Sequence, residues 1–527
     1  MLTLLFGIPA VGALVVAVWP NLDSGQVKAA ALTFAIITFA FTVYLLSGFN
    51  PSYHGFQFQQ NVQWVPSVLY SYGLHIGIQY HVGVDGVSIW LLVLNAGLTV
   101  IGIAATPKGT KRIRAFLALM LLMEAGMAGV FIALNLILFY VFWEAMLIPA
   151  YFLLWQFGEP GSTRAALKFV LFTLAGSLIM LFGIIMLPIL SGMPTFEITR
   201  LAHAHFSDTA QFLLFFLFLL ALAIKIPIFP TYSWLPDAYA AAPYPMLVTF
   251  AGVMGKAGAY AMIRILLTLF PHPIANINGF YINWDQIVPV LAVISIIYGG
   301  FLALAQEDAK KLVSYSSISH MGFIVLGIFS LNAIGIQGAI LQMINHGVII
   351  AALFLVLYFV NEKTGTMDRI RLGGLAKKTP ILTALFSISA LAALGLPGLN
   401  GFVGEFMILF GTFRTFPITA AIATIGLILS PLYMLRLYQG ISHGEQTPST
   451  ATATDIGAKE LSFMVPLIVV MLAIGLFPQG VLAHMPLPRV ENSKGTYFSP
   501  HYIKAQSHTT YVDNTIYRVC LRGATKS

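Results

Sequence analysis

Long apolar stretches, separated by short polar segments, run along almost the whole chain. A bilayer-spanning helix needs about twenty consecutive apolar residues, and windows of that kind recur throughout the sequence. Fourteen such windows lie near 2–20, 29–47, 84–105, 115–133, 136–157, 167–190, 211–230, 245–268, 286–305, 313–331, 335–360, 380–412, 417–438 and 461–482. The pattern therefore predicts an all-α polytopic membrane protein with about 14 transmembrane helices.

The amino-acid composition narrows the class of protein further. Of the 527 residues, 58% are hydrophobic and only 9% are charged, which excludes a soluble fold. The single cysteine, Cys520, excludes a disulfide framework and a cysteine-ligated iron–sulfur cluster in this chain. The net charge of +8 resides mainly in loops, so it indicates membrane orientation rather than nucleic-acid binding. No Walker A or dinucleotide-binding motif occurs, and the sequence predicts no metal or cofactor site.

Basic residues in four loops orient the helices. All of them follow odd-numbered spans and so share one side, which the positive-inside rule makes the cytoplasmic one, with both termini opposite. The aromatic segment 49–82 then lies on the outer face, either as a structured loop or as a membrane-interface belt. The four groups are Lys108, Lys111, Arg112 and Arg114; Arg164 and Lys168; Lys310 and Lys311; and Lys363, Arg369, Arg371, Lys377 and Lys378.

Lys225 is the most informative residue in this pattern. It ends a run of apolar residues, and Pro227 and Pro230 follow closely. A charge at the bilayer centre costs at least about 3 kcal/mol, so it usually marks a pathway for ions or protons. The prolines open the helix beside the charge, and unwound backbone is tolerated there only where it lines protein or water. A second break, LGLPGLNGF with Pro397, precedes Glu405 in another apolar run.

The two breaks indicate an internal repeat. Spans four to eight and nine to thirteen are predicted to be two copies of a five-helix unit, each with its broken helix in fourth place. Because the number of helices per unit is odd, the copies run in opposite directions, as in the inverted repeats of secondary transporters. The predicted organisation is three helices in 1–110 with the loop 49–82, a first unit in 111–268, a second unit in 284–440, a loop and last helix in 441–487, and a polar tail in 488–527.

Ionisable residues inside the spans have the composition of a proton path. A carboxylate beside a buried lysine offsets the cost of burial, and a nearby charge changes the proton affinity of both groups. Histidines already titrate near neutral pH. The competing interpretation is a purely structural ion pair for the acids and lysines, and a hydrogen bond between helices for the histidines. The candidates for proton translocation are Glu144, Lys225, Lys256, His320, His346 and Glu405.

Four further polar residues lie in or near the spans. Glu124 and Lys168 are auxiliary candidates, but they fit equally well as side chains that reach a membrane interface. Asp237, just after Pro236, is an auxiliary candidate or else an N-cap or first-turn acid of the next helical segment. Arg436 ends its span on the cytoplasmic side and is predicted to anchor the helix there.

At these residues the chain resembles the antiporter-like membrane subunits of respiratory complex I, most closely the subunit M type, also called NdhD or NADH dehydrogenase subunit 4. The resemblance implies fourteen helices, two inverted five-helix units and a hydrophilic axis along the membrane plane. The stretches that carry it cover most of residues 80–440: HVGVDGVSIWLLVLN, LLMEAGMAGVFIALNLILFYVFWEAMLIPAYFLL, KIPIFPTYSWLPDAYAAAP, SYSSISHMGFIVLGIF and LGLPGLNGFVGEFMILFG.

The resemblance also assigns roles in the first unit. Glu144 is similar to the family's glutamate that faces the neighbouring subunit, Lys225 to its partner lysine, and Lys256 to the central connecting lysine. The implied mechanism is charge-coupled. Quinone reduction elsewhere perturbs the charge at Glu144, the Glu144–Lys225 pair separates or re-forms, and the lysine's proton moves on through Lys256.

In the second unit the resemblance places the end of the path. His320 and His346 resemble the family's bridging histidines, and Glu405 resembles the terminal residue, which is lysine in the sister subunits. One departure is visible. Asn135 stands where many relatives have an acid, which is expected to alter the outer end of the first unit.

The implied function is proton translocation in the membrane arm of an NAD(P)H or ferredoxin:quinone oxidoreductase, without redox chemistry in this chain. NAD(P)H or ferredoxin, FMN, iron–sulfur clusters and quinone then belong to partner subunits, and the partners are sister antiporter-like subunits, small membrane subunits and lipids. The implied location is a bacterial inner membrane or a thylakoid. Three alternatives stay open: an Mrp-type cation/proton antiporter subunit, the variant subunit of a photosynthetic CO2-uptake complex, and a structural role with an inert polar axis.

Overall fold

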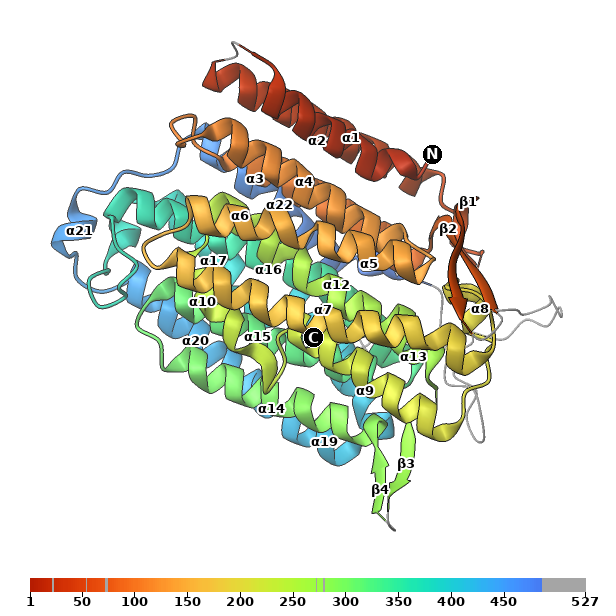
Figure 1. The fold of residues 1–527 in the computed structure, drawn as a ribbon. Helices are drawn as coiled ribbons and strands as arrows, with labels where there is room; N and C mark the ends of the chain where they lie inside the picture. The colour runs from red at the N-terminus through yellow and green to blue at the C-terminus, as the bar shows by residue number, and fades with distance from the viewer. Residues whose placement is uncertain (21–22, 54, 72–73, 272, 278–279, 486–527) are drawn as a thin grey trace.

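The computed structural model describes residues 1–485, apart from 21–22, 54, 72–73, 272 and 278–279. The helices run side by side in one elongated bundle, with short hairpins at one end and the small helix α21 at the other (Figure 1). The predicted all-α membrane fold is therefore confirmed. The polar tail predicted for 488–527, which includes Cys520, lies outside the described residues.

Helices α1 (Thr3–Val18) and α2 (Ser24–Ser47) form one edge of the bundle (Figure 1). The next helix, α3 (Gly86–Ala105), packs against α2 on the inner side of that edge. The aromatic segment predicted between the second and third spans is a structured loop, because strands β1 (Gln57–Ser71) and β2 (Leu74–Val84) pair there as an antiparallel hairpin. The hairpin leads directly into α3, whose N-terminus is capped by the Asp85 side chain.

The next part of the chain contains the first break. It comprises α4 (Ile113–Ile132), α5 (Leu136–Ala145), α6 (Leu147–Phe157), α7 (Ser162–Ser191), α8 (Ile198–Leu201), α9 (Asp208–Lys225), the 3-10 turn η1 (Thr231–Ser233) and α10 (Trp234–Ala241). One long span follows, Tyr244–Leu269, built from α11 (Tyr244–Thr249), the π-helical turn η2 (Phe250–Met254), α12 (Gly255–Ala261), the π-helical turn η3 (Met262–Leu266) and α13 (Leu267–Leu269).

The remaining elements contain the second break. A hairpin of β3 (Ile274–Ile277) and β4 (Phe280–Asn283) precedes α14 (Trp284–Leu304). Then come α15 (Ala309–Ile328), α16 (Ala333–Thr364), the 3-10 turn η4 (Leu375–Lys377), α17 (Pro380–Ala393), α18 (Asn400–Thr415), α19 (Pro417–Ala423), α20 (Ile425–Ser442), α21 (Pro448–Ala451), α22 (Ala458–Leu476) and α23 (Gln479–Leu482).

Helices occupy the positions of all fourteen predicted spans. Among the described residues, 12 helices are long and apolar enough to cross a membrane, and Thr3–Val18 and Pro380–Ala393 are shorter apolar helices. The count of fourteen crossings and the inversion of the two units stay predictions. Both predicted breaks are present, because the backbone leaves the helix at 226–230, after Lys225, and at 394–399, around Pro397.

Three inner spans are almost completely enclosed by the others. The buried share of the apolar window is 100% in Tyr244–Leu269, 94% in α16 and 89% in α15, against 28% in α2. An inner helix has no lipid-facing side, so any polar group on it must be satisfied by the protein or by water. Most of the predicted site residues lie on these inner helices or at the two breaks beside them.

Candidate functional site

Lys225 lies at the end of α9, where the first break begins. The residue is only 2% exposed, and its Nζ has no hydrogen-bond partner among the described residues. The partial negative charge of a helix C-terminus favours a cation in the last turn. The Nζ also lies 5.2 Å from the centroid of the Trp143 ring, within the cation–π range. The ammonium is therefore held by a helix end and an aromatic face rather than by a carboxylate.

Glu144 follows Trp143 on α5 and acts on Lys225 through space. The two side chains form no direct ion pair in the described structure, and Oε1 of Glu144 is buried without a partner. Glu144 is nevertheless partly exposed at the side of the bundle. Its carboxylate can thus respond to a charge on a neighbouring chain while still acting electrostatically on Lys225.

Lys256 occupies the middle of the enclosed span Tyr244–Leu269. It is 1% exposed, and its Nζ donates a hydrogen bond of 2.7 Å to the Ala251 carbonyl. That carbonyl belongs to the π-helical turn η2, and a second π-helical turn follows Lys256; such turns occur frequently at functional sites. Because α12 packs against both α9 and α15, Lys256 lies between the helices that carry Lys225 and His320.

His320 on α15 and Glu405 on α18 are directly bonded. The Nδ1 of His320 lies 2.8 Å from Oε1 of Glu405, and its Nε2 lies 3.3 Å from the Tyr433 hydroxyl. Both residues of the pair are at most 5% exposed. The other carboxylate oxygen, Oε2 of Glu405, is buried without a partner in the described structure. That oxygen can therefore accept a further hydrogen bond without breaking the contact with His320.

His346 on α16 connects this pair with Lys256. The ring centroids of His346 and His320 are 5.5 Å apart, and the charge of Lys256 acts on His346. Neither ring nitrogen of His346 has a hydrogen-bond partner among residues 1–485 as described, although the residue is only 3% exposed. The structural alternative, a hydrogen bond between helices, is thus not observed for His346.

Buried amide side chains hold Glu405 in place across the second break. The Nε2 of Gln342 donates to Oε1 of Glu405 at 3.1 Å, and Asn345 donates to the Asn400 carbonyl at 2.7 Å. All three amides are at most 1% exposed. Sequence reasoning did not select them or Trp143, because a single amide or aromatic residue in an apolar span gives no signal of its own.

Gly395 lies in the second break, close to the Glu405 carboxylate. Its φ is +80°, and a Cβ there would lie 3.3 Å from Oε2 of Glu405. Gly398 has a φ of +95° but no atom within 4 Å of such a Cβ. It therefore offers a matched control with similar backbone strain.

We expect Gly395→Ala and Gly398→Ala each to lower the free energy of unfolding by about 1–2 kcal/mol, because both force alanine into left-handed backbone. Only Gly395→Ala should also move the Glu405 carboxylate, since only its methyl group would lie against Oε2 of that side chain. Thermal unfolding of both variants, and a structure of each around residue 405, would check this. An unmoved Glu405 side chain in Gly395→Ala would contradict the expectation.

The auxiliary candidates divide into two kinds. Glu124 on α4 is 0% exposed and both of its carboxylate oxygens lack partners in the described structure, so its side chain does not reach the protein surface. Lys168 instead pairs at 2.7 Å with Asp237, an acid in the first turn of α10. The side chains of this pair are 32% and 55% exposed, and such pairs contribute at most about 1 kcal/mol.

Among the described residues, three ion pairs between distant segments involve residues that sequence reasoning did not select as a site. Arg264, in the enclosed span, pairs with Asp85 at the start of α3. Lys310, predicted as a loop residue, is 2% exposed and bonds to Glu159 at 2.6 Å and to the Ala242 carbonyl at 2.7 Å. Each pair joins segments far apart in the sequence, which local patterns do not reveal.

The third ion pair, between Glu197 and His81, bears on position 135, where this chain has asparagine and many relatives have an acid. The side chain of Asn135 caps α5 and donates a hydrogen bond of 2.7 Å to Glu197. Glu197 is 2% exposed and pairs through its other oxygen with His81 of the β1–β2 hairpin. An acid is therefore present beside Asn135, but it comes from a segment 62 residues further along the chain.

The bundle with its two broken helices and buried acids, lysines and histidines defines the class of antiporter-like membrane proteins. Residues 133–430 match the model of one family, described as NADH:quinone oxidoreductase/Mrp antiporter, TM. The chain belongs to this family. Among the described residues, no group of three or more His, Cys, Asp and Glu side chains is arranged to hold a metal ion.

Individual relatives share most of the chain. It is 38% identical over 456 residues to NADH-quinone oxidoreductase subunit M of Rickettsia typhi, covering 86% of this chain and 89% of the relative. A chain of respiratory complex I from Thermus thermophilus superposes with a TM-score of 0.80 at 32% identity, covering 92% and 97% of the two chains. A chain of the Mrp complex from Dietzia shares the fold at a TM-score of 0.77 but only 23% identity, covering 92% and 95%.

Proposed function

We propose that this chain is the M-type proton-translocating subunit in the membrane arm of complex I, and that protons move through six residues that we call the buried axis. Five of the six are at most 5% exposed, and several of their titratable atoms have no protein partner in the described structure. Buried polar groups are normally hydrogen-bonded. Buried titratable atoms without a protein partner are therefore the observation that carries the proposal. The buried axis consists of Glu144, Lys225, Lys256, His346, His320 and Glu405.

Charge drives the first step. Glu144 is the partly exposed end of the buried axis, so a change of charge on an adjacent subunit acts on it first. Its negative charge attracts the Lys225 ammonium, and neutralising Glu144 removes that attraction. The proton then passes to Lys256 and the second half of the buried axis, with buried water as the carrier between groups that are not in contact.

The second half receives and releases the proton. In this proposal His346 takes the proton from Lys256, whose charge acts on it, and the contact between the two histidine rings leads on to His320. The hydrogen bond between His320 and Glu405 completes the path, and Glu405 releases the proton towards the outer side. The electron donor, FMN, iron–sulfur clusters and quinone belong to partner subunits in this proposal, and sister antiporter-like subunits flank the chain.

Glu405→Gln tests the second half of the buried axis. The amide keeps the size of the side chain but cannot bind and release a proton, so pumping per electron should fall about threefold to tenfold. Quinone reduction, which takes place in other subunits, should continue. The measurement is proton uptake relative to electron transfer in closed vesicles that contain the assembled complex.

The matched control is Glu362→Gln, which changes an exposed acid at the cytoplasmic end of α16 and should leave the ratio unchanged. An unchanged ratio in Glu405→Gln would overturn the assignment of Glu405. Co-purification addresses the Mrp alternative. Iron–sulfur subunits that accompany the chain support complex I, and their absence together with small membrane partners supports cation antiport.

A further inference from the structure

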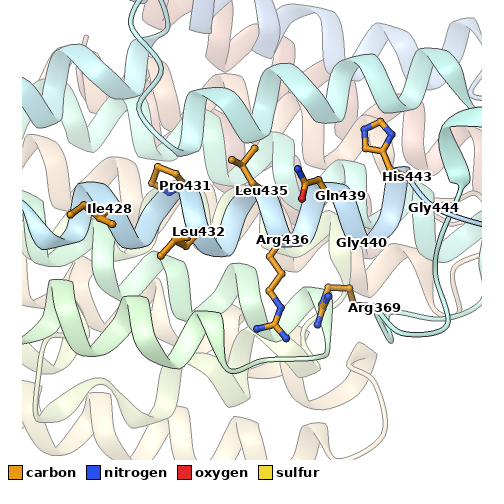
Figure 2. A pocket seen from close by; sticks show the side chains of 10 residues that line it. All are labelled: Arg369, Ile428, Pro431, Leu432, Leu435, Arg436, Gln439, Gly440, His443 and Gly444. Atoms are coloured by element: carbon orange, nitrogen blue, oxygen red, sulfur yellow. The ribbon is translucent and has the colours of Figure 1, made fainter.

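A groove along the outside of α20 lies apart from the buried axis. It has a volume of about 790 Å³, and its lining combines apolar side chains at one end with basic and polar side chains at the other (Figure 2). The apolar part is formed by Ile428, Pro431, Leu432 and Leu435. The polar part is formed by Arg369, Arg436, Gln439 and His443, with Gly440 and Gly444 completing the lining.

The two arginines at the polar end have no acidic partner in contact. In the part of the chain that the structure describes, neither forms an ion pair, and the Nε of Arg369 is buried without a hydrogen-bond partner. Arg436 donates one hydrogen bond, of 2.9 Å, to the Leu304 carbonyl of α14. Two acids act on Arg369 from a distance, Glu307 and Asp368, and Asp368 is engaged at 3.4 Å by Arg371. The polar end thus carries a positive charge that the chain only partly balances.

The two guanidinium groups point into the same space beside α20 (Figure 2). Burial and then the positive charge of Arg436 lower the pKa of Arg369, although Glu307 and Asp368 oppose this. Arg369 lies close to α20 because residue 440 is glycine. A Cβ at Gly440 would lie 2.9 Å from Cγ and 3.1 Å from Cδ of Arg369. The fold therefore brings two like charges together at a position where an anion would stabilise both.

The apolar end matches a lipid chain. Ile428, Leu432 and Leu435 are 64%, 51% and 38% exposed and recur at helical spacing along one side of α20. Ile428 lies two helical turns from Arg436, about 12 Å along the axis, so an acyl chain could lie beside the stripe while its phosphate reaches the arginines. The positive-inside rule places the arginines on the cytoplasmic side, where anionic headgroups interact with basic pockets between helices.

We propose that this groove binds one anionic phospholipid, with its phosphate between Arg369 and Arg436 and an acyl chain along Ile428, Leu432 and Leu435. Arginine suits this role because its planar guanidinium can bind a phosphate through two hydrogen bonds. The proposal concerns a lipid rather than free phosphate, since the basic end continues into an exposed apolar stripe. It is independent of the proposed proton path.

Photo-crosslinking tests the site in the complete complex. Diazirine-bearing phosphatidylglycerol and phosphatidylcholine with the same acyl chains would be added to membranes, and labelled peptides from α20 would be quantified. We expect phosphatidylglycerol to label the groove about fivefold more than phosphatidylcholine, and excess inorganic phosphate to leave that preference in place. Arg369→Gln/Arg436→Gln should abolish the preference, whereas Arg414→Gln, which removes an exposed arginine on another helix, should not.

A second variant keeps both charges. Gly440→Ala pushes the Arg369 stem away from α20, so it should weaken the preference without changing the net charge. Equal labelling by the two lipids in the wild type would overturn the proposal, and so would displacement of phosphatidylglycerol by inorganic phosphate. Labelling by neither lipid, with crosslinks from α20 to a neighbouring protein, would assign the groove to a subunit interface instead.

Discussion

Lys225→Met should abolish proton pumping, reducing pumped protons per electron at least about tenfold, while the complex still assembles. Methionine fills much of the same space beside Trp143, but it cannot carry a proton or respond to the charge of Glu144. The substitution also removes a buried charge that lacks a carboxylate in contact, so the fold should not be weakened. Proton uptake and quinone reduction measured in the same closed vesicles would give the ratio.

Lys377→Met is the matched control, because Lys377 is exposed in the loop before α17 and takes no part in the buried axis. Its pumping ratio should equal that of the unsubstituted complex. Undiminished pumping in Lys225→Met would remove the first half of the proposed path. The lipid proposal would be unaffected by that outcome, since its test measures labelling rather than pumping.

Asp85→Asn should lower the free energy of unfolding by about 3–5 kcal/mol, because it leaves the Arg264 guanidinium buried without a counter-charge. Arg264 is 6% exposed, and its side chain bonds directly to the Asp85 carboxylate. Asparagine caps a helix about as well as aspartate, so the cap of α3 is retained and the loss reports on the ion pair. Thermal unfolding of the purified complex and the amount of chain in the membrane would both show the effect.

Two further variants separate the ion pair from general sensitivity. Asp85→Asn/Arg264→Met removes both partners and should recover most of the loss, since a buried pair can often be replaced by apolar groups at little cost. Asp208→Asn changes an exposed first-turn acid of α9 and should stay within about 0.5 kcal/mol of the unsubstituted protein. A small effect of Asp85→Asn alone would show that Arg264 finds another partner.

The same pair predicts a pH dependence of the stability of the N-terminal end of α3. Burial raises the pKa of Asp85, but the Arg264 guanidinium and the cap hydrogen bonds outweigh burial and hold that pKa below its ordinary value. A depressed carboxyl pKa stabilises the folded state above the ordinary value of about 4 and loses that contribution as the pH falls further. The Asp85–Arg264 contribution should therefore be constant near neutral pH and disappear only in acid.

The sequence predicted the fold wherever hydrophobicity and helix-breaking residues set it. Bilayer thickness sets the length of the apolar windows, and proline and glycine set the two breaks. Both effects depend only on neighbouring residues in the sequence. The same holds for the ionisable residues of the buried axis, because a charge in an apolar span is conspicuous in any sequence.

Other parts of the site could not be predicted because they depend on contacts between distant segments. Trp143 is one of many aromatic residues in the spans, and only the fold places its ring against the Lys225 ammonium. Glu197 gives no local signal that it supplies an acid to Asn135 and His81. The basic pattern predicts Lys310 as a loop cation, but the packing of α15 against the first half of the chain buries it.

The enclosed span Tyr244–Leu269 has a consequence for how the protein is made. Its mean hydropathy of 1.4 is among the lowest of the candidate spans, and it carries Lys256 at its middle and Arg264 nearer its end. A lysine at mid-helix costs about 3 kcal/mol during membrane insertion, so this helix enters lipid poorly by itself. Its retention in the membrane must therefore depend on helices synthesised before and after it. Slow synthesis or loss of a neighbouring helix would then expose this segment to membrane quality-control proteases before the rest of the chain.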